Sequence, residues 1–463
     1  MNKSVICAIA TASGNGAIAL LRLSGAGAVG LADRLFVAPS GKRLAEAVPN
    51  TTLFGQIVDE GTLLDEVLVT VFRSPHSFTG EDTVEISCHG SPYIQQRLLQ
   101  LLIRTGARLA APGEFTRRAF LNGKMDLSQA EAVADLIASS SAAAHRMAMN
   151  QMKGGFSSEL RRLREAMLQI ITLLELELDF SEEEVEFADR TALLELAVHI
   201  RKLLTRLSNS FSLGNVIKNG VPVAIAGNTN VGKSTLLNAL LNEERALVSD
   251  VAGTTRDAIE ETVNLSGILF RFIDTAGIRE TADLVENMGI ERTFSKIEQA
   301  AIVLLLTDLS RGTEHFAYYY QQVKARLAPS TRLIILLNKT DITTDLLTPL
   351  ETIRLLTSGE EIIPISARTG DNLPLLIEKL TDTITTNPFG TVDVIVSNTR
   401  HYEALLRANE AIERAIAGLK ASVSSEFIAQ DIRECLHYIG EITGEITTDE
   451  VLGNIFKNFC IGK

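Results

Sequence analysis

The sequence predicts a multidomain α/β plus α protein, in which an α/β domain is inserted into a helical domain that follows an N-terminal α+β domain. Three observations predict this fold class. A glycine-rich loop at 227–234 lies between an apolar, strand-like run and a helix-like run. Apolar residues recur at helical spacing on both sides of that region. The first 124 residues mix short apolar runs with turn residues.

Composition narrows the class of protein. A chain of 463 residues has room for about two to four domains. The net charge of −13 argues against nucleic-acid binding through a global positive field, so an RNA partner would need a local basic patch or an accessory protein. The four cysteines form no disulfide framework or zinc site, which favours a reducing compartment. No apolar run is long enough to span a membrane, and the run at 5–12 makes a poor signal peptide. We therefore expect a cytoplasmic protein with no membrane partner.

The N-terminal domain is expected over residues 1–124. Three charged residues, Arg22, Glu81 and Lys124, stand late in an apolar run or beside turns. Each fits a functional position, but each also fits an ordinary solvated surface charge, and the domain itself could serve only as a dimerisation or scaffold unit. The predicted elements are strands at 18–23, 66–72 and 83–87 and a helix at 94–102.

The helical domain is expected over residues 125–217 and 385–463. Its first helix is predicted to start with a capping box at Ser128–Glu131, and a later helix at 190–211 is predicted to end at Gly214. The acidic run at 181–186 favours a solvated loop over a metal site. The apolar faces comprise Leu160, Leu163, Met167, Ile170, Ile171 and Leu174 before the insertion, and Tyr402, Leu405, Leu406, Ile412, Ile416, Leu419, Phe427, Ile428, Ile432, Leu436 and Ile439 after it.

Because neither flank looks like a complete bundle, we predict that the two flanks pack into one. The inserted domain would join this bundle near 216–220 and 387–391. The alternative is a pair of independent helical pieces.

The inserted domain, 218–384, carries the chemistry. The order of strand, glycine loop and helix around 227–234 is that of a P-loop, whose backbone N–H groups and helix N-terminus hold phosphates. Lys233 would reach the β- and γ-phosphates, and the Ser234 hydroxyl would bind Mg²⁺.

Four further motifs follow in the order found in GTPases. Gly253–Asp257 offers a threonine to Mg²⁺ and the γ-phosphate, and Asp274–Gly277 follows a predicted strand. Asn338–Asp341 ends another strand, and the Asp341 carboxylate can accept both N–H donors of a guanine edge. Ser366–Arg368 lies where a base-contacting loop is usual. Five ordered motifs predict an inserted Ras-like P-loop G domain.

The position after Asp274–Gly277 bears on hydrolysis. A Ras-like enzyme has Gln there to orient water, whereas this chain has Ile278. Either hydrolysis is vestigial, or other groups take over. Asn230 could ligate an activating cation, although it also fits a loop-stabilising amide. The candidates for positioning water or supplying charge are Arg279, Glu280, Asp283 and Glu286.

Over essentially its whole length the sequence resembles the tRNA modification GTPase family MnmE, also called TrmE. The resemblance rests on the P-loop with Asn230, on Gly253–Asp257, on Asp274–Gly277 followed by an apolar residue, and on the C-terminal Phe459–Lys463. A frayed tail is the alternative interpretation of that pentapeptide. The chain departs from the family pattern at Gly90-Ser91, where two glycines are expected.

The resemblance implies an N-terminal folate-binding domain, a helical domain and an inserted G domain activated by K⁺-dependent dimerisation. It implies a homodimer that forms a heterotetramer with a flavin-dependent partner, MnmG, which carries FAD. Together such proteins install a carboxymethylaminomethyl group at C5 of the wobble uridine, U34, of certain tRNAs. The implied cofactors are Mg²⁺, K⁺ and 5,10-methylene- or formyl-tetrahydrofolate, with GTP as the substrate.

The resemblance also implies site residues. The implied catalytic residue is Glu286, the Mg²⁺ ligands are Ser234 and Thr255, and the K⁺ ligands are Asn230, Ser249, Val251 and Thr254. Folate is expected to contact Arg22, Glu81, Lys124 and Lys463, while Cys460 is either a nucleophile or part of the binding tail. The expected GTP-binding residues are Asn230, Val231, Gly232, Lys233, Ser234, Thr235, Ser249, Asp250, Val251, Ala252, Gly253, Thr254, Thr255, Asp274, Thr275, Ala276, Gly277, Asn338, Lys339, Asp341, Ser366, Ala367 and Arg368.

Three functions remain open from the sequence. The first is a K⁺-stimulated GTPase that modifies the tRNA wobble uridine. The second is a non-catalytic GTP-dependent switch, such as a ribosome assembly factor, which Ile278 taken alone favours. The third is a folate-dependent one-carbon transferase regulated by GTP. Glu286, Asn230 and the C-terminal tail favour the first. For a tRNA-binding surface the sequence offers only two arginine pairs, 117–118 and 161–162.

Overall fold

The computed structural model describes residues 4–179, 190–228, 230–245, 261–273, 297–308, 314–329, 331–343, 347–385, 394–421, 423–457, 459 and 462. The chain forms two compact units. One comprises Met1–Ile137, Met149–Leu204 and Glu403–Lys463, and the other comprises Ala138–Ala148 and Thr205–Tyr402. The three domains predicted from the sequence, with boundaries near 124, 217 and 384, stay a prediction.

The N-terminal part of the chain is built on a seven-stranded sheet, in the order β3-β4-β5-β6-β2-β1-β7. Neighbouring strands are antiparallel except for β1 and β7, which are parallel. The strands are β1 (Ile6–Ile9), β2 (Ile18–Ser24), β3 (Phe36–Val37), β4 (Thr51–Asp59), β5 (Thr62–Phe72), β6 (Thr83–His89) and β7 (Arg108–Leu109). The predicted strands at 18–23, 66–72 and 83–87 are confirmed.

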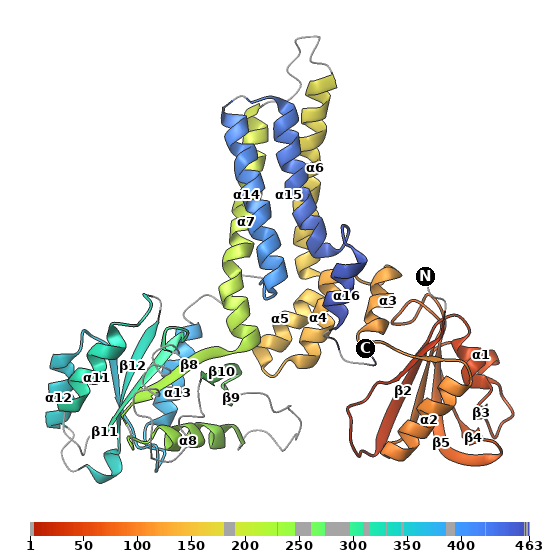
Figure 1. The fold of residues 1–463 in the computed structure, drawn as a ribbon, viewed down its shortest axis with the longest axis horizontal. Coiled ribbons are helices and arrows are strands. Elements are labelled where there is room, and N and C mark those ends of the chain that lie inside the picture. The colour runs from red at the N-terminus through yellow and green to blue at the C-terminus, as the bar shows by residue number, and fades with distance from the viewer. Residues whose placement is uncertain are drawn as a thin grey trace. The chain divides into compact units, whose positions relative to one another are not determined.

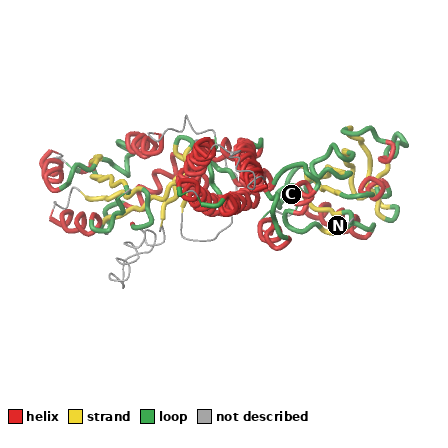
Figure 2. The backbone as a smooth tube through the Cα atoms, turned by 90° about the horizontal axis from the view of Figure 1, so that it is seen from above, coloured by secondary structure: helices red, strands yellow, loops and turns green. Residues whose placement is uncertain are grey.

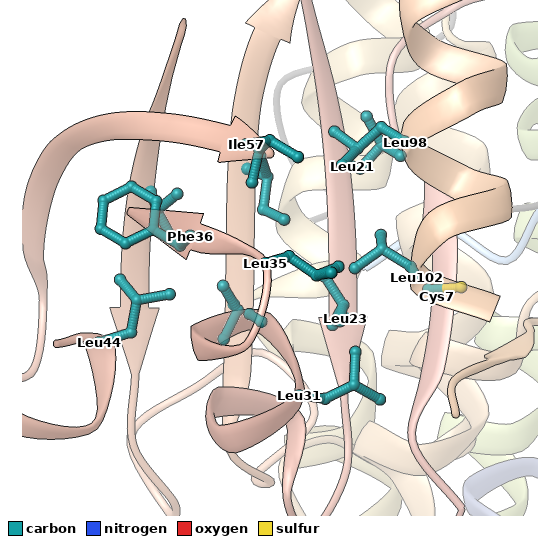
Figure 3. Packing of buried hydrophobic residues seen from close by; sticks show 14 of the residues in the cluster. Cys7, Leu21, Leu23, Leu31, Leu35, Phe36, Leu44, Ile57, Leu98 and Leu102 are labelled. Carbon is teal, nitrogen blue, oxygen red and sulfur yellow. The ribbon is translucent and has the colours of Figure 1, made fainter. Parts of the chain in front are cut away.

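One face of this sheet is covered by two helices, α1 (Ala28–Asp33) and α2 (Pro92–Arg104). Side chains alternate between the two faces of a strand, so every second residue of the central strands enters the core. Figure 3 shows Leu21 and Leu23 of β2 facing Leu98 and Leu102 of α2, with Ile57 of β4 beyond them. The helix predicted at 94–102 is therefore confirmed. A short 3₁₀ helix, Leu44–Glu46, closes the core beside β3.

The other face of the sheet is covered only in part. Helix α3 (Glu114–Leu121) and the segment after β5 pack on its β1 end, in a cluster of Ile6, Ala8, Ala110, Phe115 and Phe78. Over β4 and β5, by contrast, Phe54 and Leu68 lie directly opposite each other and are 52% and 48% exposed.

Helices form the middle and the end of the chain. They are α4 (Leu127–Ala138), α5 (Ala142–Met152), α6 (Gly155–Asp179), α7 (Arg190–Asn219), α14 (Thr399–Lys420), α15 (Ser425–Thr443) and α16 (Asp449–Lys457). Figures 1 and 2 show α6, α7, α14 and α15 running side by side. Arg414 of α14 pairs with Asp431 and Glu434 of α15, and Arg433 of α15 pairs with Glu175 of α6. The predicted single bundle is confirmed.

Most of the predicted apolar faces point into the bundle. All six predicted residues of α6 are buried, as are Leu405, Ile412 and Ile428. The prediction is wrong at Leu406 and Phe427, which are exposed.

Two predicted helix boundaries are wrong. Helix α7 continues through Gly214 and ends at Asn219. The glycine at 214 does not end the helix; it allows close packing, because a Cβ there would overlap the carbonyl oxygen of Val396. The break between α7 and the next strand is Gly220, with φ +83°, so the expected connection at 216–220 is mostly helix. The capping box at the start of α4 is formed by Asp126, not Ser128. The Gln129 N–H donates to Asp126 Oδ1 at 2.9 Å, and the Asp126 N–H donates to Gln129 Oε1 at 3.0 Å.

The inserted domain has a six-stranded sheet, in the order β13-β12-β11-β8-β10-β9. All strand pairs are parallel except β9–β10. The strands are β8 (Val221–Gly227), β9 (Glu261–Leu265), β10 (Ile268–Ile273), β11 (Ile302–Asp308), β12 (Arg332–Asn338) and β13 (Glu361–Pro364).

Helices cover both faces of this sheet. Helices α8 (Lys233–Arg245) and α13 (Leu373–Thr385) pack on one face, and α11 (Glu314–Lys324) and α12 (Leu347–Leu356) pack on the other (Figure 1). The carboxyl ends of parallel strands meet at one edge, where ligands bind in folds of this kind. The predicted fold class is confirmed. Within the described ranges no helix combines the length and the apolar character that crossing a membrane requires.

Candidate functional site

The glycine loop connects β8 to α8 as predicted. Gly227 has φ +147°, and a Cβ there would overlap the Leu306 carbonyl oxygen of the neighbouring strand β11. Asn230 and Gly232 also have positive φ, at 63° and 100°. A loop curled in this way turns backbone N–H groups toward a common centre at the helix N-terminus, which is an anion-binding arrangement.

The Lys233 side chain folds over this loop. Its ammonium group donates to the carbonyl oxygens of Gly227 at 2.6 Å and Asn228 at 3.2 Å. Burial lowers the pKa of Lys233 from its ordinary value. Charge-assisted hydrogen bonds to phosphate are stronger than those to neutral carbonyls, so phosphate oxygens can replace these acceptors.

A buried amide joins the glycine loop to the loop after β13. Asn338, at the end of β12, donates from Nδ2 to the Val231 carbonyl at 2.7 Å and accepts at Oδ1 from the Ala367 N–H at 3.0 Å. A Cβ at Gly232 would overlap Asn338 Nδ2. Asn338 therefore holds the phosphate loop and the 366–368 loop at a fixed separation.

The residues after β12 form the side of the site suited to a nucleobase. The Ser366 hydroxyl donates to Asp341 Oδ1 at 2.8 Å, which fixes the orientation of the carboxylate. Lys339 has φ 71°, and its ammonium group donates to Asp308 Oδ2 at 2.6 Å. Sequence reasoning missed Asp308, although its position at the end of the buried strand β11 was a usable signal. An oriented, partly hydrated carboxylate can accept the paired N–H donors of guanine.

Many predicted residues lie outside the described part of the chain. Of the predicted nucleotide, Mg²⁺ and K⁺ residues, the structure describes Asn230, Val231, Gly232, Lys233, Ser234, Thr235, Asn338, Lys339, Asp341, Ser366, Ala367 and Arg368. The hydrogen bonds of Asn338 bring the loops that carry them together. The predicted nucleotide and metal residues outside the described ranges are Ser249, Asp250, Val251, Ala252, Gly253, Thr254, Thr255, Asp274, Thr275, Ala276 and Gly277. The predicted catalytic residue Glu286 and the tail residues Cys460 and Lys463 also lie outside those ranges. In the described ranges no three His, Cys, Asp or Glu side chains are grouped as metal ligands.

A second candidate site lies in the N-terminal domain, around Arg22 and Glu81. The Arg22 guanidinium pairs with Glu85 at 2.7 Å, directly across from it in the β2–β6 register. It also lies 5.7 Å and 5.9 Å from the ring centres of Phe78 and Phe115, in cation–π geometry. Glu81 accepts at Oε2 from the hydroxyl of Ser24, two residues beyond Arg22 on the same strand.

Lys124 belongs to the same neighbourhood. Its ammonium group donates to the Pro75 carbonyl at 3.0 Å, and its aliphatic stem lies 3.3 Å from a Cβ placed on Gly80, next to Glu81. The structure therefore brings together three residues that are 59 and 43 positions apart in the chain.

The end of the chain packs against this domain. Phe459 packs on Phe456 with ring centres 5.1 Å apart, beside Leu127 and Ala130. A Cβ at Gly462, which has φ +98°, would overlap the Ile9 carbonyl of β1. A frayed tail is therefore wrong at both residues.

The arginine pair 117–118 was one of the two candidates for a tRNA-binding surface, but Arg118 is not a surface cation. It is buried and pairs with Glu81 and Glu114 at 2.9 Å and 3.1 Å. Burial alone would raise the pKa of Glu114, but hydrogen bonds from Arg108, the Ala111 N–H and Arg118, with the Arg108 charge, hold that pKa below its usual value. Sequence reasoning missed Glu81 as a partner because it lies 37 positions from Arg118 in the chain. It also missed Glu114, although the i,i+4 spacing to Arg118 was a usable signal.

The inserted domain assembles a phosphate loop and a carboxylate suited to guanine at one edge of a parallel sheet. That arrangement defines the class of P-loop GTP hydrolases, and this chain is one of them.

Comparison with known proteins identifies the family. A family model described as GTP-binding protein TrmE N-terminus matches residues 5–124, and another, described as MnmE helical domain, matches residues 127–460. The tRNA modification GTPase MnmE of Parabacteroides distasonis is 54% identical over 463 residues, which cover 99% of this chain and 100% of that protein. The protein of that name from Bacteroides fragilis is 55% identical over 474 residues and is matched over 100% of both chains. The chain belongs to the MnmE family of tRNA modification GTPases.

Solved structures give weaker likenesses. Era from Aquifex aeolicus bound to GDP.AlF4⁻ is 28% identical, with a TM-score of 0.28 over 41% of this chain and 66% of that one. The FeoB G-domain from Methanococcus jannaschii is 24% identical, with a TM-score of 0.26 over 36% of this chain and 98% of that one.

Proposed function

We propose that this protein hydrolyses GTP in a K⁺-stimulated reaction that serves modification of the tRNA wobble uridine. The observation that carries the GTP half of the proposal is the Asn338 bridge, which joins the Lys233 loop to the loop that orients Asp341. Membership of a tRNA modification family supports the other half.

The proposed metal chemistry uses oxygen ligands on the phosphate side. Ser234, on the first turn of α8, would bind Mg²⁺ together with Thr255, and oxygen ligands are those that Mg²⁺ prefers. Asn230, exposed and at positive φ on the rim of the phosphate loop, would bind K⁺ with Ser249, Val251 and Thr254. The cation would then supply the charge that an arginine finger supplies elsewhere, with Glu286 positioning water in place of the glutamine that Ile278 replaces.

Measuring GTP turnover in K⁺ and in Na⁺ tests this mechanism. We expect hydrolysis to be faster in K⁺, and equal, negligible rates in both salts would exclude the K⁺ mechanism. Glu286→Ala should lose hydrolysis and keep GTP binding, and unchanged turnover would assign the catalytic role to another residue. Tight GTP binding without turnover in either salt would favour the non-catalytic switch.

We further propose that the N-terminal site binds a tetrahydrofolate, either 5,10-methylene or formyl, as the one-carbon donor. Arg22, Glu81 and Lys124 supply two cations and one carboxylate, which suit the glutamate tail and the pterin ring of a folate. Lys463, which lies outside the described residues, is proposed as a fourth folate contact, contributed by the C-terminal tail.

The proposed assembly is a cytoplasmic homodimer that works with an MnmG-like flavoprotein carrying FAD. Two copies of each chain would install the carboxymethylaminomethyl group at C5 of U34. The exposed pair Phe54 and Leu68 supports self-association, because exposed apolar patches commonly mark protein interfaces.

Deleting the gene and analysing tRNA nucleosides by mass spectrometry tests the biological role. We expect the modified wobble uridines to disappear and to return when the intact gene is restored. Unaltered wobble uridines would exclude the tRNA role.

A further inference from the structure

Four charged side chains form a continuous ion-pair chain in the N-terminal domain: Arg108, Glu114, Arg118 and Glu81. Arg108 binds Glu114 with two parallel hydrogen bonds, of 2.6 Å and 2.9 Å. Glu114 accepts from Arg118 at 3.1 Å, and Arg118 donates to Glu81 at 2.9 Å. The chain therefore leads from the strand β7, through helix α3, to a residue of the proposed folate site.

Arg118 is held rigidly at the centre of this chain. Its Nη2 also donates to the Ser4 carbonyl at 3.0 Å, and its Nη1 lies 3.3 Å from where a Cβ on Gly25 would be. The Arg118 side chain is 10% exposed, and its planar fork leaves little rotational freedom once both ends are bound. A side chain fixed in this way can fix the carboxylate that it touches.

Glu81 is held through one of its two oxygens. The hydrogen bonds from the Ser24 hydroxyl and from Arg118 both end on Oε2. Ser24 is itself buried and bonded to the Thr79 hydroxyl at 2.7 Å. The Glu81 side chain is 27% exposed, so a ligand can reach the carboxylate without displacing either donor.

We propose that Arg118, supported by Glu114, is a positioning residue that orients the Glu81 carboxylate toward the pterin ring of a folate. The inference rests on the proposed folate site. A pterin presents two adjacent N–H donors, its 2-amino group and N3–H, which match an ionised carboxylate. Buried ion pairs add little net stability, so a chain of them that ends at an accessible carboxylate favours an orienting role over a purely stabilising one.

Binding of two folate probes to the full-length protein tests the inference. The first probe is 5-formyltetrahydrofolate, and the second is its analogue with methyl in place of the pterin 2-amino group. We expect the native protein to prefer the amino form by about tenfold or more, since a hydrogen bond to a charged group is being compared with none. In Arg118→Lys this preference should fall to about threefold or less, because a lysine cannot bridge both carboxylates in the same plane.

A matched control and a second variant complete the experiment. Arg97 pairs with Asp59 at 2.8 Å in the same domain, outside the ion-pair chain, so Arg97→Lys should keep the native preference. If Arg118→Lys does not fold, as judged by near-ultraviolet circular dichroism, Glu114→Gln replaces it. That variant keeps the side-chain shape and should also lower the preference.

The outcomes separate the two proposals. Equal weakening of both probes in Arg118→Lys, or an unchanged preference, would overturn the positioning role, because loss of general structure does not discriminate between the probes. Native protein that binds both probes equally would also overturn it, while leaving the folate site standing. Native protein that binds neither probe would overturn the folate site and the positioning role together.

Discussion

At the scale of single residues, Asn338 has the clearest energetic role in the nucleotide site. It is 2% exposed and satisfies two backbone groups from different loops. Asn338→Ala would leave both groups without their partner, so we expect a loss of about 2–4 kcal/mol of unfolding free energy. Urea unfolding of the nucleotide-free protein, followed by hydrogen exchange in β8 and β12, measures this.

Helix α8 of the same domain offers a control for that substitution. Asn238 is exposed on α8, so Asn238→Ala should change the unfolding free energy by no more than about 0.5 kcal/mol. Equal losses in the two variants would contradict the bridging role of Asn338. Asn338→Ala should also weaken GTP binding, because the hydrogen bonds that connect the phosphate loop to the 366–368 loop are lost.

Glu114 makes the unfolding free energy of the N-terminal domain depend on pH. Against the raising effect of burial, hydrogen bonds from Arg108, the Ala111 N–H and Arg118 hold its folded-state pKa below the ordinary value of a glutamate, so the charged form stabilises the fold. This contribution is complete above the unfolded-state pKa and is lost as the pH falls through the folded-state pKa. Glu114→Gln should therefore destabilise the domain by about 1–3 kcal/mol at pH 7, and the difference from the native protein should shrink below about pH 4.5.

Urea unfolding at a series of pH values, read by hydrogen exchange in β1 and β2, checks this prediction. Glu60→Gln is the control, because the Glu60 side chain is 87% exposed. A Glu114→Gln deficit that stays constant from pH 7 to pH 3 would show that the carboxylate charge does not contribute.

At the scale of elements, Gly214 shows how packing overrides helix propensity. Alanine is better than glycine inside a helix by about 1 kcal/mol, so propensity alone predicts that Gly214→Ala is stabilising. The structure predicts the opposite sign, because the new Cβ would overlap the Val396 carbonyl. We expect Gly214→Ala to lower the unfolding free energy by about 1–3 kcal/mol.

A second helical glycine supplies the comparison. Gly453 lies in α16, where a Cβ would meet nothing within 4 Å, so Gly453→Ala should raise stability by about 0.5–1 kcal/mol. Thermal unfolding of both variants should shift in opposite directions. If both melting temperatures shifted in the same direction, the close contact between Gly214 and Val396 would not explain the glycine at 214.

The difference between local patterns and contacts with distant segments explains which elements could be predicted from the sequence. Long periodic runs, such as α6, and buried strands, such as β11 and β12, were predictable because their patterns are local. The extent of α7 was not, because a contact with a segment some 180 residues later decides whether Gly214 ends the helix. Strand β4 was missed because its central Gly55 and its polar start weaken the strand pattern.

The candidate sites divide in the same way. The P-loop, Asn338 and Asp341 belong to motifs that combine short spacing with a known order, so their meeting at one sheet edge was predictable. Glu114 and Arg118 belong to no such motif. The pairs of Arg108 with Glu114 and of Arg118 with Glu81 form only in the folded domain, so spacing did not reveal them. The Glu114–Arg118 pair has the i,i+4 spacing of a helix and could have been predicted from it.

At the scale of the whole molecule, the proposed homodimer makes the exposed face of the N-terminal sheet a test of assembly. Phe54 and Leu68 face each other across β4 and β5, in the part of that face that α3 does not cover. Burying both in a dimer would remove apolar surface from water, at about 25 cal/mol per Å². A charge placed there would be buried without a partner.

We therefore expect Leu68→Asp to shift the protein from dimer to monomer in sedimentation experiments while leaving the monomer folded, since the side chain is about half exposed in the single chain. Tyr93→Asp is the control, because Tyr93 is also exposed, at 68%, but lies on α2, which packs on the opposite face of the sheet. If both variants stay dimeric, the dimer uses another surface. If both become monomeric, the effect is one of net charge rather than of this face. Selective dissociation of Leu68→Asp alone would assign the exposed sheet face to the homodimer.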